Sequence, residues 1–210
     1  MTSSDGDAAE AAQFLRRAAV SASAKAIFDL DINEVGFVMN VSRLWAYQPE
    51  AIAALFKLMH LVTSGRPFTE RERGILITAC ASEFGDSYCS LAWGTKLAGL
   101  AGPQLAGEIL RGKDAGLTAP ERAMAAWARR IARDPGRTSE ADVAELRQAG
   151  FSDADIFAMT VFVALRVAFS TVNDALGARP DAEFRSEAPA AVLDAVTYGR
   201  PIDTSPQPGS

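Results

Sequence analysis

The sequence predicts an all-α fold, and three observations support this expectation. Apolar residues recur at the spacing of an amphipathic helix through most of the chain, as in Ile52, Leu55 and Met59. Residues that start or stop helices lie at the ends of these segments. No segment alternates between apolar and polar residues over a useful length, so no strand is expected. With 210 residues, the chain is long enough to bury a sizeable core.

A single domain is expected to cover residues 8–200. The segment 1–7 is small and polar and is expected to be disordered, and 201–210 is expected to be a flexible tail. The composition, 49% hydrophobic and 22% charged, is typical of a soluble globular protein. The net charge of -5 argues against nucleic-acid binding, which needs clustered Lys and Arg.

Neither membrane insertion nor secretion is expected. The longest apolar run, 156–168, is interrupted by Thr160 and Arg166. The N-terminus lacks a basic start followed by an apolar block, so no secretory signal is visible. The two cysteines, Cys80 and Cys89, provide no disulfide framework. A cytoplasmic location is therefore expected.

Three helices are expected before the central stretch of the chain. An Ala-rich helix is predicted over 8–28, a second helix over 35–47, and Pro49 begins a third. Thr69 and Glu72 then form a capping-box pattern, which predicts the start of the next helix.

The stretch 69–100 is the one around which the rest of the chain is organised. It reads TERERGILITACASEFGDSYCSLAWGTKLAGL, and its pattern predicts two helices separated by a tight break. Gly85 favours a helix end, and Asp86 stands where the N-cap of the following helix belongs. Cys89 then lies in the first helical turn, where unpaired backbone amides and the helix dipole stabilise a thiolate.

Four helices are expected after a break at Gly102 and Pro103. They are a short helix over 104–110, a helix over 120–133 started by Thr118 and Glu121, a short helix from Thr138 to Gly150, and a long helix over 153–176. The long helix is hydrophobic nearly all round, which places it in the middle of the bundle or in a subunit interface.

The run GDSYCSLAWG, preceded by RERGILITACA, resembles the core motif of the carboxymuconolactone decarboxylase-like superfamily, which includes alkylhydroperoxidase D (AhpD) and peroxidase-related proteins. In redox-active members the motif implies a C-x-x-C pair at a helix N-terminus, a His four positions after the second Cys, and a Glu one helix earlier. Here Asp86 stands at the first Cys and Cys89 at the second. Trp93 stands at the His and Gly74 at the Glu.

The segment 118–177 resembles the C-terminal half of the peroxidase-related members, so the resemblance covers roughly 41–177. It implies an AhpD-like multi-helix bundle that assembles as a homo-oligomer, either a dimer, a trimer or a hexamer. Large aromatic side chains are the expected anchors of such an interface, namely Trp45, Phe56, Phe162 and Phe169.

Cys89 is the candidate nucleophile, and the role of Asp86 is open between a structural cap, a general acid or base, and a hydrogen-bond acceptor for a ligand. The Asp86 charge raises the pKa of a neighbouring thiol, whereas the helix dipole lowers it, and the sequence leaves the sign open. Cys89 could also be a buried cysteine that acts as a small hydrophobe. Cys80 is expected to fill the core, without a disulfide to Cys89.

The candidates for substrate binding are Tyr88, Trp93, Arg166 and Glu83. Arg166 is the one charged residue within an apolar segment, so it must find a carboxylate or lie on an exposed edge. Asp86, Glu83 and Asp174 are its candidate partners, and an alternative role is to line a pocket for an anionic or carbonyl ligand.

No cofactor and no metal site are predicted. His60 is the only histidine, and the two cysteines do not cluster, so zinc or iron sites of the usual kinds are not supported.

Two classes of function follow from these residues and the resemblance. The first is a peroxidase-like oxidoreductase in which Cys89 attacks a peroxide and an external thiol completes the cycle, because no second cysteine stands at position 86. The same fold could instead support lactone or decarboxylation chemistry, with Asp86, Tyr88 and Arg166 around a small acidic or carbonyl substrate. The second class is a non-catalytic, ligand-binding or structural oligomer that lacks the redox relay.

Overall fold

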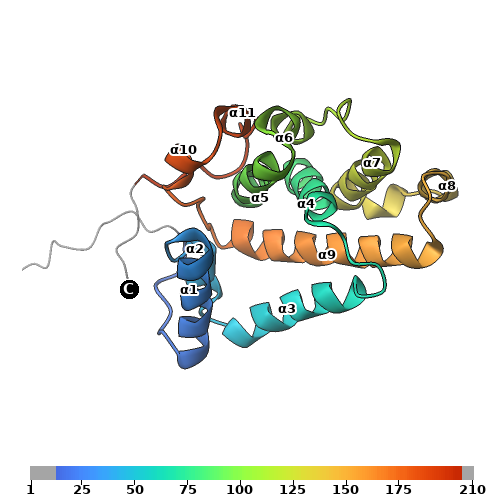
Figure 1. Ribbon diagram of the computed structural model, residues 1–210. Coiled ribbons are helices and arrows are strands. Elements are labelled where there is room, and N and C mark those ends of the chain that lie inside the picture. The colour runs from blue at the N-terminus through green and yellow to red at the C-terminus, as the bar shows by residue number, and fades with distance from the viewer. Residues whose placement is uncertain (1–12, 205–210) are drawn as a thin grey trace, which may run out of the picture.

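The computed structural model describes residues 13–204 and is all-helical in that range (Figure 1). The helices are α1 (Ala22–Val35), α2 (Asn40–Trp45), α3 (Pro49–Val62), α4 (Glu70–Phe84), α5 (Ser87–Ala101), α6 (Pro103–Leu110), α7 (Ala119–Arg133), α8 (Glu140–Gln148), α9 (Asp153–Ala175), α10 (Phe184–Glu187) and α11 (Ala190–Leu193), with a 3-10 turn η1 (Pro135–Arg137). The predictions for residues 1–7 and for most of the C-terminal tail lie outside the described residues.

Helix α9 runs through the middle of the molecule (Figure 1). Helices α4 and α7 pack against one side of it, and α5 and α6 continue that layer beyond α4. Helix α3 packs against the other side, next to α1 and α2. The largest buried cluster joins α4, α5, α6, α7 and α9, so both helices of the 69–100 stretch contribute to the main core.

The bounds predicted for the first two helices are wrong. The backbone from Phe14 to Ser21 is not helical, and α1 begins only after Ser21, whose hydroxyl accepts a hydrogen bond from the backbone N–H of Ala24. Helix α1 ends at Gly36, which adopts the left-handed conformation with φ 86°. Gly36 lies inside the second predicted helix, and only α2 remains helical there.

The predicted start signals after residue 49 are largely confirmed. Pro49 begins α3, and capping boxes form at Thr69 and Glu72 and at Thr118 and Glu121. The short helix α8 is capped by Ser139 rather than Thr138, because Asp142 returns the hydrogen bond to Ser139. This moves its start by one residue relative to the prediction.

Helix α9 matches its predicted bounds to within one residue, and its apolar character extends beyond the run 156–168. By length and composition α9 could cross a membrane, because its 23 residues tolerate Arg166 and Thr160 within an apolar segment. In this fold α9 instead packs against α3, α4 and α7.

Candidate active site

The break between α4 and α5 has the predicted geometry. Gly85 adopts φ 86°, and its N–H donates to the carbonyl of Ala81 at 3.0 Å, which closes α4. Asp86 follows as the N-cap of α5, and its Oδ1 accepts a hydrogen bond from the backbone N–H of Cys89 at 2.9 Å. The prediction that Asp86 caps this helix and that Cys89 lies in its first turn is confirmed.

Two residues of α9, one helical turn apart, complete the surroundings of Cys89. Nη2 of Arg166 lies 3.2 Å from the Cys89 Sγ. The Ser170 hydroxyl donates to Oδ2 of Asp86 at 2.5 Å and lies 3.9 Å from the same sulfur. All four side chains are buried. The residues Asp86, Cys89, Arg166 and Ser170 therefore form one polar cluster, called here the Cys89 cluster.

The electrostatics of this cluster keep Cys89 protonated at rest. Burial is the main factor that raises the pKa of the Cys89 thiol well above its usual 9.0, and the negative charge of Asp86 raises the pKa further. The positive charge of Arg166 opposes both effects. Burial and the charge of Asp86 therefore both act against a thiolate at this helix N-terminus.

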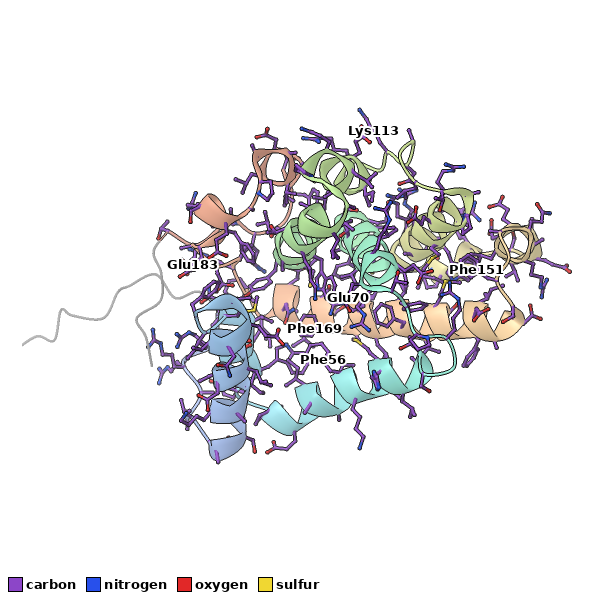
Figure 2. All side chains as sticks on the ribbon, in the orientation of Figure 1. Phe56, Glu70, Lys113, Phe151, Phe169 and Glu183 are labelled. Carbon is purple, nitrogen blue, oxygen red and sulfur yellow. The ribbon has the colours of Figure 1, made fainter. Side chains whose placement is uncertain are left out.

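Arg166 also borders a cavity of about 210 Å³ on the side of α3. The cavity is lined by Phe56, Met59, His60, Thr63, Arg73, Ile77, Trp93, Phe162 and Arg166. The Arg166 guanidinium carbon lies 5.0 Å from the ring centroid of Phe169 and 5.8 Å from that of Trp93. Figure 2 shows Phe56 and Phe169 facing one another between α3 and α9, with ring centroids 5.6 Å apart.

Arg166 satisfies neither of the two simple expectations from the sequence. It is 5% exposed, so it does not lie on an edge, and within residues 13–204 it forms no ion pair with a carboxylate. Asp86 is near enough to act on the same thiol, but its oxygens bind Ser170 and the backbone of Cys89 instead. Its position agrees with the alternative expectation, an Arg that lines a pocket. Trp93, another candidate for substrate binding, lines the same cavity.

The structure does not bring Tyr88 to the cavity. Tyr88 is buried on another side of α5, where its hydroxyl donates to Oδ2 of Asp181 and accepts from the backbone N–H of Val41 at 3.3 Å. Oδ1 of Asp181 accepts from the backbone N–H of Asn40 at 2.7 Å. The position of Tyr88 therefore indicates a structural role, in which it ties α5 to α2 and to the segment after α9.

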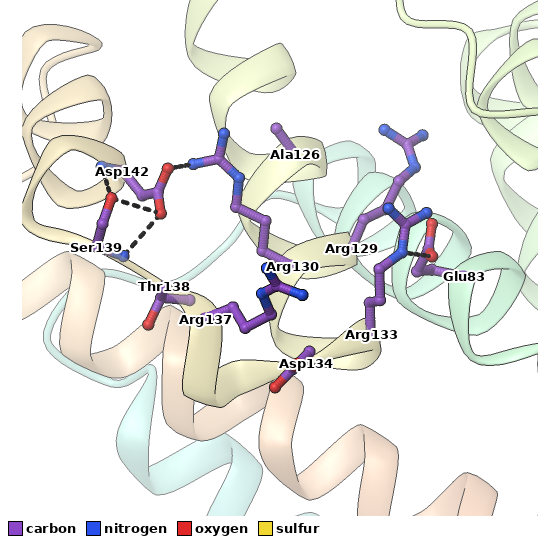
Figure 3. A pocket seen from close by; sticks show the side chains of 10 residues that line it. All are labelled: Glu83, Ala126, Arg129, Arg130, Arg133, Asp134, Arg137, Thr138, Ser139 and Asp142. Atoms are coloured by element: carbon purple, nitrogen blue, oxygen red, sulfur yellow. Dashed lines mark hydrogen bonds and ion pairs between the residues drawn. The ribbon is translucent and has the colours of Figure 1, made fainter.

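Glu83 is also directed away from the Cys89 cluster. It forms an ion pair with Arg133 of α7 and lines a separate surface pocket of about 560 Å³ (Figure 3). Arg129, Arg130 and Arg137 line the same pocket, and the first two are paired with acidic side chains. This arrangement is that of a charged surface held by ion pairs, and it does not bring Glu83 to the cavity beside Arg166.

Cys80 and Asn173 lie outside the Cys89 cluster. Cys80 is buried in the main core, where desolvation raises the pKa of its thiol to about 12, and neither cysteine forms a disulfide. Oδ1 of Asn173 accepts a hydrogen bond from the Trp45 indole at 2.9 Å. Residues 13–204 contain no group of three His, Cys, Asp or Glu side chains that could hold a metal ion.

Ser170 is the member of the Cys89 cluster that sequence reasoning missed. Its position one turn after Arg166 on the same helix was the available signal, because residues at this spacing share a face. The signal is weak, since a serine on a long helix usually bonds to the backbone of its own helix.

Comparisons with known proteins identify the fold. No protein-family model matches the chain, and no curated protein matches it. Two crystal structures of peroxidase-related proteins are similar to it. One, from Ralstonia eutropha and described as an alkylhydroperoxidase AhpD core, has a TM-score of 0.71 and 23% identity over 82% of this chain and 94% of that chain. The other, from Silicibacter sp. TM1040, has a TM-score of 0.73 and 24% identity over 83% of this chain and 95% of that chain.

A third similar structure is the debrominase Bmp8, with a TM-score of 0.68 and 15% identity over 88% of this chain and 97% of that chain. At these identities the comparisons concern the fold. They agree with the all-helical fold of the described residues. The chain therefore has the AhpD-like fold of the peroxidase-related proteins.

Proposed function

We propose that this chain is a peroxidase-like, thiol-dependent oxidoreductase that acts through Cys89. The observation that carries the proposal is the contact between the Arg166 guanidinium and the Cys89 sulfur in the first turn of α5. A thiolate formed there gains a cation at hydrogen-bond distance and the positive end of a helix dipole. The AhpD-like fold of two peroxidase-related proteins supports the same class of reaction.

Asp86 is the group that removes the thiol proton. Its Oδ1 binds the backbone N–H of Cys89 and its charge acts on the Cys89 thiol, so a carboxylate lies beside the proton that must leave. Arg166 then stabilises the thiolate that remains. Ser170 holds Asp86 in place through its hydrogen bond to Oδ2.

The reaction itself needs a hydroperoxide and an external thiol. The Cys89 thiolate attacks the outer peroxide oxygen, the O–O bond breaks, and the alkoxide leaves and takes up a proton as an alcohol. The sulfur is thereby oxidised to a sulfenic acid. Two equivalents of external thiol return it to the thiol and release water and a disulfide. An external thiol is needed because Asp86 occupies the position of a resolving cysteine, and Cys80 is buried in the main core.

The proposal includes a homo-oligomer. Of the four aromatic residues expected at its interface, Trp45 stacks on Phe169 within the chain and Phe162 packs edge-on against Phe68. Phe56 is 44% exposed on α3 and remains the best candidate anchor, together with the exposed Leu58 and Leu61 on the same helix.

A second candidate reaction is the thiol-dependent removal of halogen from a small aromatic ring. Its support is the similarity to Bmp8, whose cysteine-to-alanine variant was crystallised with 2,3,4-tribromopyrrole, together with the aromatic cavity bordered by Arg166. In this reaction a carbon–bromine bond is replaced by a carbon–hydrogen bond, two thiols are oxidised to a disulfide, and bromide and a proton are released.

Peroxide consumption by the full-length chain with dithiothreitol tests the first proposal. Cys89→Ala is expected to abolish turnover, whereas Cys80→Ala is the matched control and is expected to retain it. Dimedone, which traps sulfenic acids, is expected to label Cys89 alone after peroxide treatment.

Bromide release from 2,3,4-tribromopyrrole with the same variants tests the second reaction. If the folded chain shows no Cys89-dependent reaction in either assay, a ligand-binding or structural oligomer is the better description.

A further inference from the structure

The cavity beside Arg166 has a positive lining in an acidic protein. Its polar walls include Arg73, His60 and Arg166, and no Asp or Glu is among its lining residues in the described part of the chain. The whole chain has a net charge of -5, so this local excess of cationic side chains is not a consequence of composition. A cavity lined in this way favours a negatively charged occupant.

Both arginines have unused hydrogen-bond donors. The Nε of Arg166 and the Nε of Arg73 are buried and have no hydrogen-bond partner within residues 13–204. Arg73 has one carboxylate near it, Glu70, at 3.6 Å. Among the described residues, the hydrogen-bond and cation–π partners of Arg166 are the Cys89 sulfur and the rings of Trp93 and Phe169. A buried guanidinium without a carboxylate partner is costly, and a ligand anion would supply the missing acceptor and the missing charge.

The remaining walls are apolar and largely aromatic. Phe56, Trp93 and Phe162 contribute rings, and Met59 and Ile77 contribute aliphatic surface. Flat rings favour planar apolar groups through stacked or edge-on contacts. The volume of about 210 Å³ is smaller than the roughly 300–1,000 Å³ of sites for drug-sized ligands, so the occupant must be small.

We propose that this cavity binds a small aromatic carboxylate, with its acid group on Arg166 and Arg73 and its ring among Phe56, Trp93 and Phe162. This deepens the proposed function, because it gives the substrate of Cys89 an aromatic acid framework that would carry the reacting hydroperoxide or halogen group, and it rests on that function only for the chemical step. Binding itself depends on the arginines and the aromatic walls, and not on the thiol.

Isothermal titration of the full-length chain with benzoate tests the proposal. Benzamide is the neutral probe of the same shape, and cyclohexanecarboxylate is the charged probe without an aromatic ring. Benzoate is expected to bind about tenfold more tightly than benzamide, because only the acid can form charge-assisted hydrogen bonds with the arginines. Cyclohexanecarboxylate is expected to bind more weakly than benzoate.

Three variants locate the site. Arg73→Gln is expected to weaken benzoate binding about tenfold through the loss of one charged donor. Arg166→Met is expected to remove the preference for benzoate over benzamide. Arg133→Gln changes an arginine of the separate surface pocket and is expected to leave binding unchanged. Circular dichroism checks that each variant is folded. If Arg166→Met does not fold, Arg73→Gln alone tests whether the arginines of the cavity bind the acid group of benzoate.

The outcomes separate this proposal from the proposed function. Equal binding of benzoate and benzamide, no measurable binding of benzoate, or unchanged binding by Arg73→Gln would overturn the proposal. Cys89→Ala is expected to bind benzoate as the natural chain does. Benzoate binding without any Cys89-dependent turnover would refute the thiol chemistry alone, whereas turnover without a preference for the acid would refute the ligand class alone.

Discussion

Nη2 of Arg166 lies 3.2 Å from Sγ of Cys89, which joins the middle of α9 to the first turn of α5. Arg166 is the nearby charge that lowers the pKa of the Cys89 thiol, against burial and the charge of Asp86. A reactive thiolate at this position therefore depends on a residue 77 positions later in the chain.

Replacing Arg166 tests this dependence directly. Arg166→Met is expected to raise the pKa of Cys89 and to slow its alkylation by iodoacetamide at pH 9 about tenfold, since one pKa unit is a tenfold change in thiolate. Arg166→Lys keeps the charge and is expected to slow the reaction less. Alkylation is followed by mass spectrometry of the Cys89 peptide. Unchanged or faster alkylation of a folded Arg166→Met variant would show that the guanidinium does not stabilise the thiolate.

Asp86 has two roles that one substitution can separate. Asn caps helices about as well as Asp, so Asp86→Asn is expected to leave the melting temperature nearly unchanged. Removing the negative charge is expected to lower the pKa of Cys89 and to speed its alkylation, because Asp86 raises that pKa. Peroxide turnover is nevertheless expected to fall, because the proton acceptor is lost. If turnover rises together with alkylation, Asp86 is a cap and not a base.

The break that presents Cys89 was predictable from the sequence because its determinants are local. A left-handed Gly85 and an N-cap at Asp86 involve hydrogen bonds within five residues along the chain, to Ala81 and to Cys89. The same holds for the capping boxes of α4 and α7. Helix ends of this kind leave a signature in the order of residue types.

The partners of these residues were not predictable, because they lie far away in the sequence. Ser170 donates a hydrogen bond to Asp86 across 84 positions, and Tyr88 donates one to Asp181 across 93 positions. Tyr88 adjoins Cys89 in the sequence, yet successive residues on a helix point about 100° apart, so the two side chains face different neighbours. Closeness in sequence therefore led to a substrate-binding assignment of Tyr88 that the packing does not support.

The stability of the protein is expected to fall as the pH rises from about 4 to about 7. Burial is the main factor that raises the pKa of Asp181 from 3.8 to about 7 in the folded chain. The folded state therefore binds a proton that the unfolded state has lost, so this contribution is fully present below pH 3.8 and disappears as the pH rises through 7. Urea unfolding at several pH values in this range measures the slope of the free energy of unfolding against pH. Asp181→Asn is expected to make this slope smaller. Burial also raises the pKa of Asp174, to about 6, so Asp174 contributes to the slope in the natural chain and in the Asp181→Asn variant alike. An identical slope in the variant would contradict the assignment to Asp181.

Tyr88→Phe distinguishes a structural Tyr88 from one that binds substrate. The substitution removes the hydroxyl that donates to Asp181 and accepts from the backbone of Val41, which leaves two buried groups without that partner. The free energy of unfolding is expected to fall by about 1–3 kcal/mol, measured by urea denaturation. Turnover per folded molecule is expected to stay unchanged, because the ring keeps its packing and the Cys89 cluster is not touched. Trp93→Leu is the matched comparison, since it removes an aromatic wall of the cavity and is expected to raise KM. A rise in KM for Tyr88→Phe with unchanged stability would restore the substrate-binding role of Tyr88.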